Sequence, residues 1–125
     1  MQKYTVEVNE NGSVFWYKHG TNELHRIDGP AIEYANGDKR WYQNDKLHRI
    51  DGPAEEWTNG DKYWYQNGKP HRTDGPAVEW ANGNKYWYIE GKELFEKEFL
   101  QRTSTFNGKV IEYEGKKYKL QLMEE

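Results

Sequence analysis

Short runs in which aromatic and polar residues alternate recur along the whole chain, and turn residues bound each run. In the middle of the chain, residues 53–57 and 62–66 have the composition of strands, with Asn59-Gly60 between them and Asn67-Gly68 after them. Asn-Gly between extended runs is typical of a type I′ turn, because both central residues must take a positive φ. The pattern therefore predicts antiparallel β-hairpins.

The hairpin pattern is repeated with a period of 23 residues. Segments 24–46, 47–69 and 70–92 align without a gap, and the first two match at 18 of 23 positions. Self-similarity at such a period indicates an array in which each unit buries its apolar side against the next.

The two ends of the chain differ from the array and are expected to cap it. Residues 1–23 contain two strand-like runs around Asn11-Gly12, which predicts a degenerate hairpin. Residues 93–125 predict a short helix over 93–103, because apolar residues fall near helical spacing, and then a hairpin of 110–113 with 118–122. We expect one domain over 1–125. Its predicted fold class is mainly all-β, a single-layer antiparallel array of hairpins with a helix-plus-hairpin cap.

Turn length predicts which side chains share a face. A two-residue loop at Asn59-Gly60 would place Trp57 opposite Lys62 and Glu55 opposite Trp64. All the array tryptophans would then form a core side, and a solvated side would carry tyrosines and charges. The core side is expected to hold Ile32, Tyr34, Trp41, Trp57, Trp64, Val78, Trp80 and Trp87. The solvated side is expected to hold Tyr42, Tyr63, Tyr65, Tyr86, Tyr88, Glu33, Glu56, Glu79 and Arg40.

Composition narrows the class of protein. Only 34% of residues are hydrophobic, but 16% are aromatic, which favours a thin folded core over a disordered tail. The net charge of −3, with both signs interspersed, leaves no basic stripe for a nucleic acid. The chain has no cysteine for a disulfide or thiolate metal site, and no apolar run long enough for a membrane span. A cytoplasmic protein is expected.

One motif, His-Arg-x-Asp-Gly-Pro-Ala, occurs at 25–31, 48–54 and 71–77. Its three histidines would lie about 9–10 Å apart on successive hairpins, too far to share one metal ion. A His–Asp pair suits acid–base chemistry, but near-identical copies without an adjacent nucleophile argue against an enzyme or a cofactor. The favoured interpretation is a structural corner, in which Asp binds backbone amides, Gly takes a positive φ and Pro stiffens the turn. In that corner Arg72 would lie opposite Tyr63 and His71 opposite Trp64.

The run from Trp64 to His71, Trp-Tyr-Gln-Asn-Gly-Lys-Pro-His, resembles the MORN repeat family in a variant bacterial form. The resemblance covers about residues 11–92. It implies a sheet of stacked hairpins with an interaction or scaffolding role. The motif ending in Asp-Gly-Pro-Ala is similar to tandem proteins of bacteriophages and mobile elements. It replaces the family's Gly-x-Gly, so the lipid binding attributed to some members is not carried over.

These observations predict a non-catalytic protein–protein interaction module. The resemblance further implies that the chain is a phage accessory protein, which would bind and inhibit a bacterial host factor such as a defence enzyme. The alternative is a carbohydrate- or nucleotide-binding module that uses the aromatic face. Free strand edges also leave open the pairing of two copies. The predicted binding residues are Tyr42, Tyr63, Tyr65, Tyr86, Tyr88, Arg49, Arg72, Glu56 and Glu79.

Overall fold

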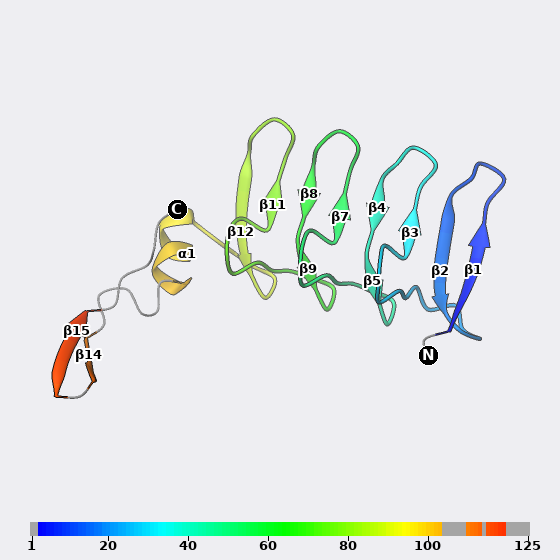
Figure 1. Cartoon of the computed structure of the whole chain (residues 1–125). Helices are drawn as coiled ribbons and strands as arrows, with labels where there is room; N and C mark the ends of the chain where they lie inside the picture. Colours follow the sequence, from blue (N-terminus) through cyan, green and yellow to red (C-terminus); the bar gives the residue numbers. More distant parts are fainter. Residues whose placement is uncertain (1–2, 104–109, 114, 120–125) are drawn as a thin grey trace.

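The computed structural model describes residues 3–103, 110–113 and 115–119, and it is mainly β, as predicted. Nine antiparallel strands form one long sheet, in which hairpins stand side by side in chain order (Figure 1). Its strands, in spatial order, are β1 (Tyr4–Val8), β2 (Val14–Lys18), β3 (Ile32–Glu33), β4 (Lys39–Arg40), β7 (Glu55–Glu56), β8 (Lys62–Tyr63), β11 (Val78–Glu79), β12 (Lys85–Ile89) and β13 (Lys92–Leu94).

Two short hairpins come between strands of the long sheet in the sequence, and they lie at the lower ends of the tall hairpins in Figure 1. They are β5 (Tyr42–Gln43) with β6 (Lys46–Leu47), and β9 (Tyr65–Gln66) with β10 (Lys69–Pro70). Asn67 and Gly68, which join β9 to β10, have φ of 51° and 81°. The predicted type I′ turn is therefore confirmed there, since both central residues are left-handed.

The tall hairpins turn differently, and the predicted register is wrong by one residue. Glu55 pairs with Tyr63 and Glu56 with Lys62, so the loop is the three residues from Thr58 to Gly60. Gly60 has a φ of 102°, and its amide donates to the carbonyl of Trp57 at 2.9 Å. A one-residue change in register moves the side chains of one strand to the other face. The predicted division into a tryptophan side and a tyrosine side therefore fails.

An aspartate in each of two tall turns ties one hairpin to the next. Asp38 accepts a hydrogen bond from the amide of Thr58 at 2.8 Å, and Asp61 accepts one from the amide of Ala81 at 2.7 Å. The Thr58 hydrogen bond is the main reason that the pKa of Asp38 is lowered, because it favours the charged carboxylate. These contacts fix the spacing of neighbouring turns.

The expected N-terminal hairpin is confirmed by the pairing of β1 with β2. Helix α1 (Glu96–Thr103) begins three residues later than predicted, because Lys92–Leu94 pairs with β12 as β13. Phe99 of α1 is buried and its ring lies 6.5 Å from that of Trp87. The last hairpin joins β14 (Val110–Tyr113) to β15 (Lys116–Lys119), and the rest of the predicted second strand, 120–122, lies outside the described residues. No helix in the described ranges is long and apolar enough to span a bilayer.

Small residues, not tryptophans, fill the most buried positions. Ala31, Ala54 and Ala77 are fully inaccessible, whereas Trp57 and Trp80 are 37% and 38% exposed. The prediction of a tryptophan core is thus wrong. The sheet is so thin that its largest side chains lie along its faces.

Candidate functional site

The tryptophans are divided between the two faces of the sheet. Trp16, Trp41 and Trp64 each lie under an arginine on the side that we call the arginine face. The arginine face is defined by Arg26, Arg49, Arg72, these three tryptophans, Glu33, Glu56 and Glu79. Trp57 and Trp80 lie on the opposite side, against Tyr63 and Tyr86 respectively.

Each arginine of the motif closes a corner with four contacts. The Arg72 guanidinium lies 3.9 Å above the ring of Trp64, not opposite Tyr63 as predicted. Its Nε donates to Asp74 at 2.8 Å, and its Nη1 donates to the Pro76 carbonyl at 3.0 Å and to Glu79 at 3.3 Å. Corresponding contacts recur 23 and 46 residues earlier, at Arg49 and Arg26. This set supports the structural interpretation of the motif.

The glycine of the motif leaves room for the guanidinium in its observed position. A Cβ on Gly75 would lie 2.8 Å from Cζ of Arg72. A Cβ on Gly52 or on Gly29 would lie at the same distance from Cζ of Arg49 or of Arg26, respectively. None of these glycines has a positive φ, so the predicted reason for glycine is wrong. Asp74 likewise binds the arginine rather than the predicted backbone amides. The guanidinium of Arg72 therefore lies close to both the indole ring of Trp64 and the backbone of Gly75, an arrangement that we call the guanidinium sandwich.

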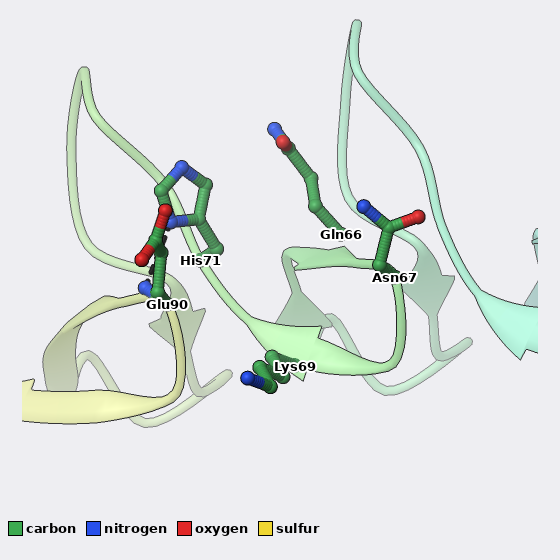
Figure 2. A pocket seen from close by; sticks show the side chains of 5 residues that line it. All are labelled: Gln66, Asn67, Lys69, His71 and Glu90. Carbon is green, nitrogen blue, oxygen red and sulfur yellow. Dashed lines mark hydrogen bonds between the residues drawn. The ribbon is translucent and has the colours of Figure 1, made fainter.

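Each motif histidine joins one hairpin to the following one. Nδ1 of His71 accepts a hydrogen bond from the amide of Glu90 at 2.8 Å, and Nδ1 of His25 accepts one from Asn44 at 2.9 Å. His71 lines an open polar hollow of about 280 Å³. Figure 2 shows its bond to Glu90 on one side, with Gln66 and Asn67 across from it. Burial and nearby Lys18 lower the pKa of His25, which favours the neutral ring that can accept this bond.

An alternating row of charges crosses the arginine face. Strand pairing places Lys62 directly opposite both Glu56 and Glu79, and Glu79 also faces Lys85. Opposite charges in directly paired positions stabilise a sheet by about 0.2–1 kcal/mol per pair. The full row is Glu33, Lys39, Glu56, Lys62, Glu79 and Lys85. The three glutamates of this row are also paired with the motif arginines, so their charges are balanced within the face.

The other side, which we call the tyrosine face, carries aromatic residues in three rows. The upper row is Tyr34, Trp57 and Trp80. The middle row, set by direct strand pairing, is Phe15, Ile32, Arg40, Glu55, Tyr63, Val78 and Tyr86. The lower row consists of the pairs Tyr42–Leu47, Tyr65–Pro70 and Tyr88–Glu93.

The tyrosine face is hollowed where the second and third units meet. An open hollow of about 370 Å³ lies where Val78 is paired with both Tyr63 and Tyr86, and where Pro70 is paired with Tyr65. Its lining thus combines aromatic rings with smaller apolar side chains. The complete lining is Tyr63, Tyr65, Pro70, Val78, Trp80, Tyr86, Tyr88 and Glu93.

The lower-row tyrosines are held in their neutral form. Burial is the main reason that the pKa values of Tyr42, Tyr65 and Tyr88 lie above the ordinary value. Carboxylates add to this effect, from Glu55 at Tyr65 and from Glu93 at Tyr88. Neutral phenols can both donate and accept hydrogen bonds, which suits a binding surface.

In the middle row, the two positions before Tyr63 hold a charged pair, Arg40 and Glu55, instead of apolar residues. Nε of Arg40 lies 3.8 Å from a carboxylate oxygen of Glu55, and it is buried without a hydrogen-bond partner. The Arg40 guanidinium also lies 5.1 Å from the ring of Tyr34. The face is therefore chemically uneven, with a charged part over β4 and β7 and an apolar part over β11.

The predicted binding residues do not form one surface. The structure brings together Tyr42, Tyr63, Tyr65, Tyr86 and Tyr88 on the tyrosine face. It places Arg49, Arg72, Glu56 and Glu79 on the arginine face, where they pair with one another. Sequence reasoning missed Trp57, Trp80, Val78 and Pro70 as neighbours of the tyrosines. A three-residue loop, which Asn-Gly also permits, would have indicated this grouping.

Within the described residues, no group of three or more His, Asp or Glu side chains is placed to hold a metal ion. No family model, no curated protein and no solved structure matches this chain. Among the described residues, the candidate site is therefore identified from geometry alone, as a half-exposed aromatic surface with an apolar hollow.

Proposed function

We propose that this chain is a non-catalytic interaction module that binds a partner protein through its tyrosine face. The observation that carries the proposal is the grouping of four tyrosines and Trp80 around an apolar hollow. Tyrosine and tryptophan are enriched at binding hot spots, because each provides a large rigid contact area together with a polar group.

The arginine face supports this choice by contrast. Two hollows of about 560 and 510 Å³ lie between successive corners, and Asp51 lines both. Asp51 is already bound to Arg49, and Arg49 also bonds to Glu56 and the Pro53 carbonyl. A ligand there would have to compete with contacts that hold the fold.

The resemblance to variant MORN repeats of phages and mobile elements extends the proposal to the class of partner. A phage-encoded chain would act in the bacterial cytoplasm on a host protein, and covering a surface of a defence enzyme would inhibit it without chemistry. This extension rests on the motif at 25–31 and its two copies.

One observation favours a second candidate, a carbohydrate- or nucleotide-binding module. The hollow on the tyrosine face combines stacking surfaces with a carboxylate, Glu93, and its volume of about 370 Å³ is within the range of small-molecule sites. A sugar ring or base would stack on Tyr65 or Tyr88.

Capture from bacterial lysate tests the main proposal. Tagged protein is compared with the double variant Tyr65→Ala/Tyr88→Ala and with the control Lys62→Ala, whose side chain is exposed on the arginine face. We expect one near-stoichiometric protein with the wild type and the control, and its loss with the double variant. A folded wild type that captures nothing, but whose tryptophan fluorescence is quenched by a glycan or nucleotide, would favour the second candidate.

A further inference from the structure

We propose that the tyrosine face recognises a polyproline II segment of its partner, with the segment running across the strands along the lower row. This inference rests on the proposed function and specifies what the face binds. The segment would carry proline where it meets the hollow and a basic residue where it reaches Glu93.

The first argument is spacing. Tyr42, Tyr65 and Tyr88 occupy corresponding places in successive units. Two residues before them, Arg40, Tyr63 and Tyr86 lie two strands apart in the continuous sheet, through Glu55 and Val78 respectively. Two strand spacings are about 9.4–9.8 Å. A polyproline II helix has three residues per turn and rises about 3.1 Å per residue, so it presents the same side every 9.3 Å or so. Successive turns would therefore meet successive tyrosines.

Other peptide conformations fit this spacing less well. An extended strand repeats its side chains on one face about every 6.6–6.8 Å, which does not match one unit of the array. Two turns of an α-helix rise about 10.8 Å, which is longer than one unit of the array. The period of the tyrosines selects the polyproline II conformation.

The second argument is the chemistry of the hollow. Its lining combines the apolar side chains of Val78 and Pro70 with the rings of Tyr65 and Tyr88. Aromatic-lined grooves suit proline, because a rigid ring packs between aromatic rings and little conformational entropy is lost on binding. Phenol hydroxyls of the lining can donate to the carbonyls of the ligand, which a polyproline II backbone leaves unpaired.

The third argument is charge. The lower row ends at Glu93, which is exposed, pairs with Tyr88 and lines the hollow. Glu93 contributes to the raised pKa of Tyr88, so its negative charge acts on this part of the face. A lysine or arginine next to the proline segment would complement that charge. This gives the bound segment a direction along the row.

The test uses two synthetic probes with the full-length protein: an acetylated peptide of nine prolines followed by arginine, and a Gly-Ser peptide of equal length that also ends in arginine. Binding is followed by tryptophan fluorescence and calorimetry. We expect the proline peptide to bind at least about ten-fold more tightly. Tyr65→Ala and Tyr88→Ala should each weaken it by about five-fold, the loss expected for one aromatic contact, and Lys62→Ala should not.

A charge exchange gives a second readout that does not depend on removing a tyrosine. Replacing the peptide's arginine by glutamate should weaken binding by about three-fold to the wild type but not to Glu93→Gln. Equal binding of the proline and Gly-Ser peptides, or unchanged binding by a folded Tyr65→Ala variant, would overturn the inference. If a captured partner depends on Tyr65 and Tyr88 but is not displaced by the proline peptide, this inference fails while the proposed function stands.

Discussion

The two faces of this sheet are formed by the same strands, but their side chains differ in how far they bind one another. On the arginine face, Arg49 binds two carboxylates and a carbonyl while it covers an indole ring. On the tyrosine face, Trp57 and Trp80 remain more than a third exposed, and the hollow over Val78 is open. One side satisfies its own groups, whereas the other leaves large aromatic surfaces in contact with solvent.

This contrast separates the residues that hold the fold from those available for binding. A single-layer sheet has no second layer to bury its apolar side, so stability must come from contacts within each face. The guanidinium sandwich and the charge row supply those contacts on one side. The opposite side is thereby free to vary, as the exchange of Ile32, Glu55 and Val78 at corresponding places illustrates.

The sharpest way to break the comparison is to remove one tryptophan from each face. Trp64→Ala should lower the free energy of unfolding by about 3 kcal/mol, since it exposes the corner beneath Arg72, and Trp57→Ala by only about 1 kcal/mol. Urea unfolding of the two variants measures the difference. Equal losses would mean that both faces contribute alike to the fold, contrary to the division drawn above.

A smaller change tests whether the guanidinium sandwich itself causes the stability of the arginine face. Gly52→Ala should cost about 1–2 kcal/mol, because its Cβ would meet Arg49 at 2.8 Å. In an Arg49→Ala background the same change should cost nearly nothing, which makes the double-mutant cycle its own control. A cost that persists without the arginine would place the strain in the backbone instead.

The smallest expected effect concerns the histidine links between hairpins. The pKa of His25 is lowered in the folded protein, so the unfolded chain takes up the proton first. The contribution of His25 should be complete above the ordinary histidine pKa of about 6.5 and should decrease as the pH falls below it. Thermal unfolding across pH 5–8 should therefore show a smaller acid loss for His25→Asn than for the wild type. Identical pH profiles would contradict this role.

Much of the architecture was predictable because turn chemistry is local. Asn67-Gly68 indicated a type I′ turn and the structure has one, and the spacing of apolar residues indicated a helix near Phe99. The faces were not predictable in the same way, because Asn59-Gly60 is compatible with a three-residue loop as well as with a two-residue loop. This one-residue difference in loop length decides whether Trp57 shares a face with Trp64 or with Tyr63.

The chemistry of the motif was only partly predictable for a different reason. Its role as a structural corner followed from the copies, but several of its partners lie outside the motif. His71 bonds to an amide 19 residues later, and Arg72 stacks on the ring of Trp64, which precedes the motif. Such contacts depend on the neighbouring hairpin, which a pattern within one segment does not specify.

The histidine hydrogen bonds that join successive hairpins would allow the array to gain or lose whole units. Each joint uses residues that are supplied again 23 positions later, as His25 to Asn44, His48 to Asn67 and His71 to Glu90 show. Loss or duplication of residues 47–69 by unequal exchange would join the remaining units through the same set of contacts. A lineage of such chains can thus change the extent of its aromatic surface by whole units, without inventing a new contact to hold the longer sheet together.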